Sequence, residues 1–591
     1  PARESGNPLD FSPEWFSLKD MSKVVERILR AFLADEKIII FSDYDADGIP
    51  GAVVLHDLFK KIGYTNFENY IPHRHEEGFG LNVEAVKKFA AGDGDVNGGR
   101  ANGDVDGKAK LIITIDCGIA DVEPARLTRE LGIDLIITDH HEPLQSGLPE
   151  AYAILNPKQS GCEYPEKMLC GAGVIFKLVQ AILIEIRAVG ADGETASDAA
   201  KKVREKFPAT AQIANGWEKW LLDMVGLATL SDMVPLTGEN RAFAYYGLKV
   251  LRISPRIGLG KLLSSAGSKL GNITEDDISF TITPRINAAS RMGIPMEAFS
   301  LLSTKNEVEA GMLTESLNLK NDERKTLVAS MAREINKRLE ERMKSEALRE
   351  VIVMGHPDWR PSLLGLVANT LKDDHSRPVF LWGREGGNGN GAAGAENGGE
   401  SVALIKGSCR SDHSASVVAL MTEAKDLFIN FGGHTRSGGF SMLQEHIHFL
   451  EDRLVEAFKK FSDGAIFSPQ SEKQTIDKIL SINDANWQTW RIVERLGPFG
   501  TGNPKPVFLF DDAVVGSIKQ FGKQKNHLEL SLEKRNGAGR VIGIRFFSKP
   551  SNLSYTPYVG GRARVVATLE KSMFRNFPEL RLRVIDVFAP N

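Results

Sequence analysis

Three short apolar runs in this chain each lead into aspartate or histidine, and no other feature constrains the fold as strongly. The runs cover residues 38–41, 111–115 and 135–138, and they are rich in isoleucine. Runs of this length and composition are typical of fully buried parallel strands rather than of helices. Helix-like stretches separate them, so the sequence predicts a βαβ series and the α/β fold class.

Acidic and imidazole side chains follow each of these runs. In an open parallel sheet, the carboxyl ends of the strands form the edge at which ligands bind. We therefore expect the side chains that follow the runs to meet at one edge. They are Asp43, Asp45, Asp47, Asp116, Asp139, His140 and His141.

This gathering of charge predicts a metal centre. An aspartate after one strand is often a helix cap or a turn former, but capping hardly explains three strands with the same ending. So much negative charge is costly to gather unless cations neutralise it. A ligand set rich in oxygen, with one or two imidazoles, suits Mn²⁺ or Mg²⁺ better than a structural zinc ion.

The residues of this edge also carry a family resemblance. Four segments, 43–48, 116–118, 139–141 and 231–236, resemble the four motifs of the DHH phosphoesterases. Within that superfamily the chain is most similar to the RecJ family. The segments that carry this second resemblance follow in the expected order and are 284–292, 356–359, 407–411, 432–434 and 498–504. The resemblance extends from about Leu18 to the end of the chain.

The resemblance implies a single-stranded-DNA-specific 5′→3′ exonuclease that acts in DNA recombination and repair. Such an enzyme releases 5′-mononucleotides by phosphodiester hydrolysis with two Mn²⁺ or Mg²⁺ ions. The implied ligands are Asp43 and Asp45 for one ion, Asp47, His140 and Asp232 for the other, and Asp116 between the two. The implied catalytic residues are Asp47, Asp116, His140 and His141. We expect His141 to orient a neighbouring ligand or to touch the scissile phosphate.

Two later segments predict anion binding. Gly432, Gly433 and His434 lie in a glycine-rich turn, whose backbone N–H groups can form an anion nest. Ser408 and Arg410 offer a hydroxyl and a planar, permanently charged guanidinium. Either segment alone is more often a plain turn. The resemblance implies that both hold the DNA backbone or its terminal phosphate. It also implies that the same groove is lined by Arg285, Asn287 and Arg291.

One departure from the family pattern follows Trp359. RecJ-like sequences usually have a histidine next and a glycine two residues later, whereas this chain has Arg360, Pro361 and Ser362. An arginine can contact phosphate, but it cannot act as a near-neutral acid or base. We therefore expect the substrate contacts, and not the metal centre, to differ from the family at this point.

The C-terminal segment, residues 513–591, is basic and alternates like β-strands. It has fourteen lysines and arginines against five aspartates and glutamates, while the whole chain has a net charge of −4. Repeated short strands predict a small barrel, here an oligonucleotide-binding (OB) fold. With Phe574, Arg575 and Phe577 exposed, it would grip single-stranded nucleic acid by charge and stacking. A solvated basic surface on a purely structural barrel is the alternative.

These features predict four parts in chain order. They are a catalytic domain with a parallel sheet (1–305), a long connecting helix (306–348), a second α/β domain that binds substrate (349–465), and a linker with the OB-fold domain (466–591). Mixed three- and four-residue apolar spacing predicts the helix. A dimerising coiled coil is less favoured, because no clean heptad persists. The segments 91–108 and 386–400 have almost no large apolar residues and are predicted to be surface loops.

Composition narrows the setting in which the chain works. No apolar run reaches the ~18 residues of a membrane span, and no secretory signal opens the chain, so we expect no membrane association. Four cysteines do not make a disulfide framework in 591 residues, which favours the reducing cytoplasm. We expect a monomer that binds single-stranded DNA. A single-strand-binding protein and a helicase are natural partners by family.

Two other classes of function fit part of this pattern. A DHH phosphodiesterase for nano-RNA or cyclic dinucleotides shares the metal motifs but usually lacks a basic terminal barrel. A non-catalytic replication scaffold like the Cdc45 proteins typically loses metal ligands, whereas every expected acid and histidine is present here. Digestion of single strands labelled at the 5′ or the 3′ end would separate the three classes.

Overall fold

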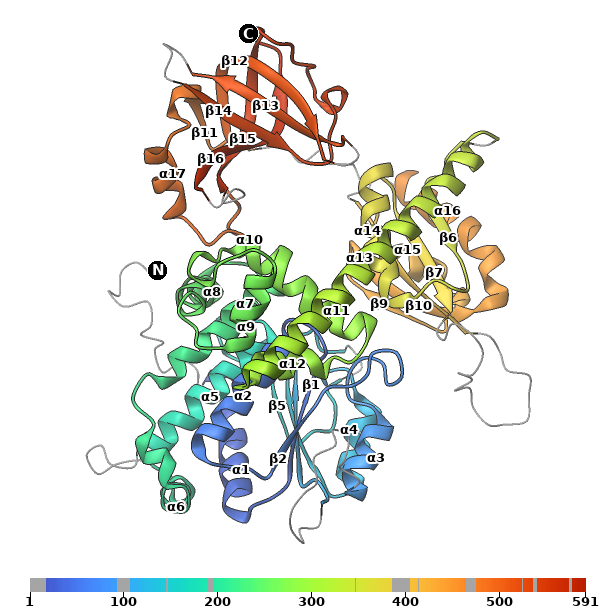
Figure 1. Ribbon diagram of the computed structural model, residues 1–591. Helices are drawn as coiled ribbons and strands as arrows, with labels where there is room; N and C mark the ends of the chain where they lie inside the picture. Colours follow the sequence, from blue (N-terminus) through green and yellow to red (C-terminus); the bar gives the residue numbers. More distant parts are fainter. Residues whose placement is uncertain are drawn as a thin grey trace.

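The computed structural model describes most of the chain. The described residues are 17–92, 107–144, 147–188, 196–345, 347–384, 404–412, 414–463, 475–522, 525–534, 539–572 and 577–590. They form three bodies, each built on its own β-sheet (Figure 1). The predicted loop 386–400, most of the predicted loop 91–108, and Phe574 and Arg575 lie outside the described residues.

The first body contains a five-stranded sheet in the order β2-β1-β3-β4-β5, and all neighbouring strands are parallel. Its strands are β1 (Ile38–Ser42), β2 (Phe67–Tyr70), β3 (Leu111–Ile115), β4 (Asp134–Thr138) and β5 (Ala153–Leu155). The three predicted strands are therefore confirmed as β1, β3 and β4. They lie next to one another in the centre of the sheet.

Helices cover both faces of this sheet, which explains why its strands are apolar throughout. One face packs against α1 (Met21–Ala34), α2 (Gly48–Ile62) and α5 (Gly171–Arg187). The other face packs against α3 (Val83–Ala91) and α4 (Val122–Glu130). Alternate residues of one strand enter different cores, as Ile38 and Ile39 do. The strand order reverses at β1 and β3, and such a reversal opens a crevice at the carboxyl ends of the strands.

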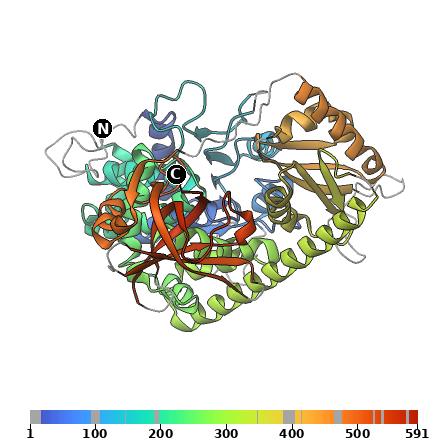
Figure 2. The same ribbon diagram turned by 90° about the horizontal axis from the view of Figure 1, so that it is seen from above.

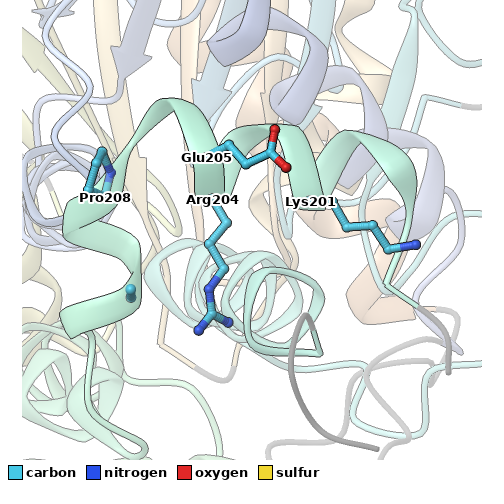
Figure 3. A pocket seen from close by; sticks show the side chains of 5 residues that line it. Lys201, Arg204, Glu205 and Pro208 are labelled. Atoms are coloured by element: carbon cyan, nitrogen blue, oxygen red, sulfur yellow. The ribbon is translucent and has the colours of Figure 1, made fainter. Parts of the chain in front are cut away.

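Further helices complete the first body. They are α6 (Asp198–Lys206), α7 (Leu222–Ser231), α8 (Gly238–Leu251), α9 (Ile257–Ser265), α10 (Glu275–Asp277), α11 (Thr283–Met292) and α12 (Met296–Ser303). A shallow hollow on α6 and the turn after it is lined by Lys201, Arg204, Glu205, Pro208 and Ala211 (Figure 3). None of these residues belongs to the predicted metal centre.

The helix α13 (Glu307–Met343) joins the first and second bodies. Its 37 residues span about 55 Å at 1.5 Å per residue, and it runs along one side of the molecule (Figure 2). Ala310 and Leu317 pack into the core of the first body, whereas Ile335 and Leu339 pack against the second. The predicted connecting helix is therefore confirmed, although it ends five residues before residue 348. The chain turns there to enter the next sheet.

The second body has a mixed sheet in the order β6-β7-β8-β10-β9. Its strands are β6 (Ile352–Gly355), β7 (Val379–Arg384), β8 (Leu404–Arg410), β9 (Asn430–Gly433) and β10 (Ser437–Leu443). Only β6 and β7 are parallel, and α14 (Pro361–His375) connects them. The other helices are α15 (Val417–Glu423) and α16 (Ile447–Asp463). This body is the predicted second α/β unit.

The third body is a closed barrel, as predicted. Its strands are β11 (Lys478–Ser481), β12 (Phe508–Phe521), β13 (His527–Glu533), β14 (Arg540–Arg545), β15 (Arg562–Ser572) and β16 (Glu579–Phe588). The long strand β12 pairs with β13 along its second half and with β15 along its first, which closes the sheet. The helix α17 (Trp487–Glu494) precedes the barrel strand β12 and lies against β15. Among the described helices, none is both long and apolar enough to cross a bilayer.

Candidate active site

The three central strands deliver the predicted acids to one place. The backbone ladder continues one residue past each strand, because Asp43 N donates to Ile115 O (3.0 Å), Asp116 N to Thr138 O (2.9 Å) and Asp139 N to Leu155 O (3.0 Å). Asp232 joins them from the end of α7. Three overlapping groups result, within each of which the ligand atoms lie within 4.8 Å of one another: Asp43, Asp45 and Asp116; Asp47, His140 and Asp232; Asp116, His140 and His141.

Asp116 lies at the centre of this cluster and has an unusual backbone. Its φ of 62° is in the left-handed region, which aspartate tolerates better than most residues. A Cβ at Gly171 would lie 2.6 Å from the Asp116 Cβ, so only glycine fits opposite it. The close approach brings the first residue of α5 against the acidic cluster.

Asp47 is held by the N-terminus of α5. Its Oδ2 accepts a hydrogen bond from Gly171 N (2.6 Å), and its Oδ1 accepts one from Ala172 N (2.8 Å). These N–H groups belong to the first helical turn and have no partner within the helix, and the helix dipole there favours negative charge. In the preceding loop, Asp45 Oδ1 accepts from Asp47 N (2.7 Å) and Gly48 N (3.2 Å). Backbone donors thus orient two of the acids before any cation is considered.

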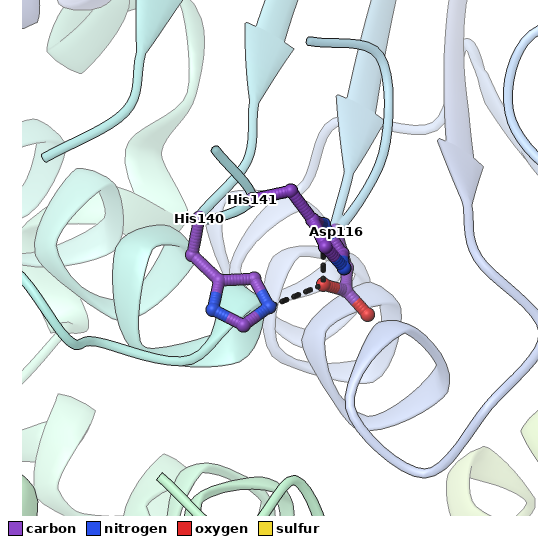
Figure 4. A group of neighbouring side chains, drawn as sticks. All are labelled: Asp116, His140 and His141. Carbon is purple, nitrogen blue, oxygen red and sulfur yellow. Dashed lines mark ion pairs between the residues drawn. The ribbon is translucent and has the colours of Figure 1, made fainter. Parts of the chain in front are cut away.

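The two histidines after β4 have different surroundings. His140 is buried, and its Nε2 lies 3.1 Å from Asp116 Oδ1, 3.8 Å from Asp47 Oδ2 and 3.7 Å from Asp232 Oδ2. The more exposed His141 lies beside His140, with ring centroids 4.6 Å apart, and its Nδ1 lies 3.9 Å from the same Asp116 Oδ1 (Figure 4). His140 thus belongs to two of the three groups, the one with Asp47 and Asp232 and the one with Asp116 and His141.

Asp139 holds His141 and received no role from the sequence. Its Oδ1 lies 2.8 Å from His141 Nδ1 and also accepts from the backbone N–H groups of His140 (2.7 Å) and His141 (3.0 Å). Its Oδ2 accepts from Ile119 N (3.0 Å). The carboxylate therefore serves the loop and the His141 ring rather than the acidic cluster. The sequence Asp139-His140-His141 could have indicated this role, because it places a carboxylate next to the two histidines.

The electrostatics of the cluster match a cation site. Burial, together with the neighbouring carboxylates, raises the pKa of Asp43 and of Asp116 well above the usual range. Burial and Asp45 raise the pKa of Asp47 to about 7, and partial burial with Asp47 raises the pKa of Asp232 to about 8. Burial and the neighbouring His141 lower the pKa of His140 to about 3, so this ring is neutral. A neutral imidazole among repelling carboxylates is a typical metal ligand set.

His141 differs from His140 in charge. Burial lowers its pKa, but the hydrogen bond and the charge of Asp139 outweigh that effect and raise the pKa of His141 to about 9. In the metal-free protein His141 is therefore a cation at neutral pH. Its side chain is 44% exposed, so the positive charge can meet a ligand that reaches the cluster.

The predicted substrate residues of α11 have structural partners. Asn287 Oδ1 accepts a hydrogen bond from Ala46 N (3.0 Å), which braces the loop that carries the first three aspartates. Arg285 donates to Asn318 Oδ1 (2.7 Å) and Thr281 O (2.7 Å). Arg291 donates to Ser362 O (2.5 Å) at the start of α14. The last contact joins the first body to the second.

The segment of the second body that departs from the family pattern lies at this contact. Arg360 is the N-cap residue of α14, and its guanidinium lies 3.8 Å from Glu323 on α13, with both side chains half exposed. Pro361 takes the first helical position, where a proline suits the helix. Ser362 supplies a carbonyl rather than a side chain to Arg291.

The predicted anion-binding segments lie on neighbouring strands of the second sheet. Ser408 and Arg410 are on β8, and Gly432 and Gly433 are on β9, with β10 between them. Arg410 donates to Ser408 Oγ (3.2 Å), and burial lowers its pKa. His434 is exposed at the end of β9.

Two further arginines, Arg74 and Arg324, join this group and were missed from the sequence. Burial and the charges of these two lower the pKa of Arg291 to about 9. The Arg74 guanidinium lies 4.8 Å from the centre of the Tyr44 ring, and its charge lowers the pKa of Asp43. The Nε of Arg324 is buried and receives no hydrogen-bond acceptor among the described residues. No sequence pattern signals these two, because they come from the loop after β2 and from the middle of α13.

The barrel carries an aromatic cluster that the sequence reasoning also missed. The rings of Phe521, His527, Phe546 and Phe547 lie 4.9 to 6.1 Å apart by centroid. The Arg583 guanidinium lies 4.1 Å from the centre of the Phe546 ring. Phe547 is 82% exposed and has a φ of 51°. Phe577, which was predicted as a contact residue, is 74% exposed.

Comparison with known proteins agrees with this geometry. Residues 37–204 match the N-terminal domain of the DHH family, and residues 476–586 match the RecJ OB domain. The single-stranded-DNA-specific exonuclease RecJ of Bacillus subtilis is 31% identical over 97% of this chain. Over nearly its whole length the chain is similar to RecJ proteins. It spans 64% of the length of the Bacillus protein, and 91% of the RecJ of Haemophilus influenzae, to which it is 28% identical over 97% of its own length.

A solved member of the RecJ family has the same fold. The crystal structure of RecJ from Thermus thermophilus in complex with Mn²⁺ aligns with 97% of this chain and 72% of its own, with a TM-score of 0.71 and 23% identity. A structure of the same protein in complex with Mg²⁺ aligns with a TM-score of 0.66. The likeness therefore covers all three bodies of the chain.

Metal-free protein should lose stability as the pH rises. The folded pKa values of Asp47 (about 7) and Asp232 (about 8) exceed that of an unfolded aspartate (~3.9). The folded state therefore binds more protons, and its extra stability is present below about pH 4 and lost as the pH rises toward 8. In excess EDTA we expect Tm to fall from pH 5 to 8, and we expect Mn²⁺ to restore it.

The variant Asp116→Asn provides the comparison, because asparagine also tolerates the left-handed backbone. Because asparagine replaces a carboxyl group whose ionisation burial disfavours, its metal-free form should be more stable than wild type at pH 8 by about 1 kcal/mol or more. Thermal denaturation of both proteins in EDTA measures this difference. Parallel profiles for the two proteins would show that the buried carboxylates do not repel one another as described.

Proposed function

We propose that this chain is a metal-dependent 5′→3′ exonuclease that degrades single-stranded DNA and releases 5′-mononucleotides. The observation that carries the proposal is one cluster that contains the six predicted metal ligands, with Arg74 and Arg291 beside it. Burial lowers the pKa of Arg285, Arg291, Arg324 and Arg410, and among the residues described no ion pair with a carboxylate offsets that effect. Partly buried guanidinium groups without carboxylate partners suit phosphate, and a charged polymer supplies several phosphates at once.

The residues at the centre fit divalent cations. Asp43 Oδ1 and Asp116 Oδ1 are buried and accept no hydrogen bond within the described chain, and a buried oxygen without a donor is costly unless a cation contacts it. We propose that Asp43 and Asp45 hold one Mn²⁺ or Mg²⁺, that Asp47, His140 and Asp232 hold the other, and that Asp116 contacts both. When bound, such a pair supplies an activated water and charge stabilisation of the leaving oxygen.

The protein's own groups then have separate roles. The His141 Nδ1 is engaged by Asp139, which leaves Nε2 to donate to a phosphate oxygen. We therefore favour contact with the scissile phosphate over the alternative that His141 orients a neighbouring ligand. Asn287 and the N-terminus of α5 keep the acidic loop in place.

The arginines and the second body would set the direction in which the strand is digested. Arg291 on α11 donates a hydrogen bond to the start of α14. It is close enough to the metal centre for the charge of Asp45 to act on its pKa. We propose that Ser408, Arg410 and the glycine turn of β9 continue this anion-binding surface on the second body. We propose that this surface receives the 5′ end of the strand, so that hydrolysis removes nucleotides from that end.

We propose that the barrel holds the incoming single strand. Its basic surplus attracts the backbone, and the cluster of Phe521, His527, Phe546 and Phe547 offers faces on which bases stack without sequence readout. A DNA substrate favours work in recombination and repair, in the cytoplasm. A single-strand-binding protein and a helicase would then supply and open the substrate of a monomeric enzyme.

Neither alternative class fits as well. A phosphodiesterase for nano-RNA or cyclic dinucleotides needs no basic barrel with exposed rings. A replication scaffold like the Cdc45 proteins needs no complete ligand set, whereas here all six predicted ligands lie together.

Removal of the central carboxylate should abolish hydrolysis. Asp116→Ala should reduce kcat on a single-stranded oligonucleotide by at least about a thousandfold, because the metal ions supply several kcal/mol of transition-state stabilisation. Binding of the same strand at low salt should largely persist. The control is Glu142→Gln, which changes an exposed carboxylate next to His141. Turnover of Asp116→Ala within tenfold of wild type would contradict the two-ion assignment.

Strand state and polarity give the sharpest test of the activity. On DNA hairpins we expect digestion of a 5′ tail, a stall near the duplex junction, and resistance of a blunt end and of a 3′ tail. A path that fits one backbone excludes a duplex, whose minor groove alone is ~6 Å wide. Product ladders on the three hairpins measure this. Equal digestion of blunt and 5′-tailed hairpins, or preference for the 3′ tail, would refute the proposal.

The aromatic cluster should contribute to binding of long strands. We expect Phe547→Ala to weaken binding of a 20-nucleotide strand by about 5- to 100-fold, since each stacked base contributes about 1–3 kcal/mol. Hydrolysis of a dinucleotide should stay unchanged. Tyr558→Ala is the matched control, because Tyr558 is 61% exposed outside the cluster, and Phe577→Ala tests the originally predicted contact. If only Phe577→Ala weakens binding, the cluster is not the contact surface.

A further inference from the structure

The segment 496–505, which we call the docking loop, connects α17 to the barrel strand β12 but touches the first body. It contains one of the segments that resemble the family, 498–504, to which no role has yet been given. Its Thr501 O accepts a hydrogen bond from Leu236 N (2.7 Å), and its Leu496 O accepts one from Arg241 (2.5 Å). The contacts reach Leu236, the last residue of the fourth motif, and Arg241 on α8.

A second set of contacts ties the docking loop to α10. Lys505 Nζ lies 2.5 Å from Asp276 Oδ2, and Phe499 N donates to Glu275 Oε1 (3.3 Å). The loop is thus held on both sides of Thr501, by α8 and the turn before it and by α10. These contacts therefore join the segment that leads into the barrel to the first body, which carries the metal centre.

The docking loop has a braced shape of its own. Gly500 and Asn503 exchange backbone hydrogen bonds of 3.0 and 3.1 Å. The side-chain amide of Asn503 donates to Leu496 O (3.0 Å) and Pro498 O (2.7 Å). A loop closed by four internal hydrogen bonds resists bending, so it can hold the residues that it contacts in a fixed position.

Its two inner glycines allow a close approach to the first body. A Cβ at Gly500 would lie 2.9 Å from Leu236 Cδ1. Gly502 has a φ of +73°, and a Cβ there would lie 3.2 Å from Pro235 Cβ. The loop therefore presses directly on Pro235 and Leu236, and Leu236 is buried.

These two residues follow Asp232 through a short turn. Asp232 ends α7, and the next residue, Met233, has a φ of 59°, which is an uncommon backbone for a methionine. The Asp232 side chain is 28% exposed, compared with 1% for Asp47 and 3% for Asp116. Asp232 is thus the least enclosed of these three carboxylates, and packing within its own body constrains it least.

We propose that the docking loop is a positioning element for Asp232. By fixing Pro235 and Leu236 it fixes the strained turn at Met233, and so it holds the Asp232 carboxylate toward His140 and Asp47. The inference rests on the proposed assignment of Asp232 as a metal ligand. It adds that the barrel is anchored to the metal centre and that the quality of this anchor sets metal affinity.

A matched pair of glycine variants tests the proposal. Gly502→Ala and Gly560→Ala both add a methyl group at a left-handed glycine, but no atom lies within 4 Å of the added Cβ at Gly560. Both variants therefore carry the same backbone strain, and only Gly502→Ala displaces Pro235. Mn²⁺ binding to the full chain is measured by calorimetry without DNA, and Mn²⁺ activation is measured with a dinucleotide that is too short to reach the barrel.

We expect Gly502→Ala to weaken binding of one Mn²⁺ by about tenfold or more and to lower kcat at limiting Mn²⁺, with the KM for a long strand within twofold of wild type. Gly560→Ala should leave all three quantities within twofold. Equal Mn²⁺ affinities for the two variants, or a change in KM alone, would overturn the proposal.

A charge exchange keeps the test decisive if Gly502→Ala does not fold. Lys505→Asp and Asp276→Lys should each weaken Mn²⁺ binding, and the double variant should restore it, since both residues lie outside the metal centre. Single variants that bind Mn²⁺ normally would overturn the proposal, and so would a double variant that does not restore the binding lost in the single variants. If wild type binds two Mn²⁺ ions but does not cleave single strands, the proposed function fails and the positioning role is still decided by the binding data.

Discussion

Repulsion among buried carboxylates is the constraint on which the rest of this structure depends. Asp43, Asp47 and Asp116 are almost fully enclosed, and ionised groups in such a place are costly unless they are paired or hydrogen-bonded. The fold meets part of that cost with the N-terminus of α5, the loop donors around Asp45 and the neutral ring of His140. The remainder is left for cations, and that imbalance gives the site its affinity for metal.

The other two bodies are arranged around this centre. The helix α13 packs in both the first and the second body, and it carries Arg324 beside the arginines of α11. The docking loop brings the barrel against the turn after Asp232. Positive charge thus lies next to negative charge without direct neutralisation. Under the proposed function, the arginines would bind phosphate and the carboxylates would bind metal.

Much of the fold follows from the sequence because its signals are local. The three buried strands, the long helix, the second α/β unit and the barrel were all predicted from run length, periodicity and turn residues. The helix ends at Met343 rather than near residue 348. The residues that follow include good helix formers, so the local sequence does not show that the chain leaves the helix there to enter β6. The six predicted metal ligands lie together, since they follow adjacent parallel strands or, for Asp232, a motif in the family order.

The sequence by itself determined the α/β class, the residues at the carboxyl ends of β1, β3 and β4, and the presence of a basic barrel, since each depends on periodicity, composition or a short motif. Only the tertiary structure decided that Asp139 holds His141, that Arg74 and Arg324 join Arg291, that the barrel rings gather at Phe546, and that the docking loop presses on Pro235. Each of these pairs residues from separate elements, and their distance in space depends on how whole bodies pack, which no local pattern in the chain encodes.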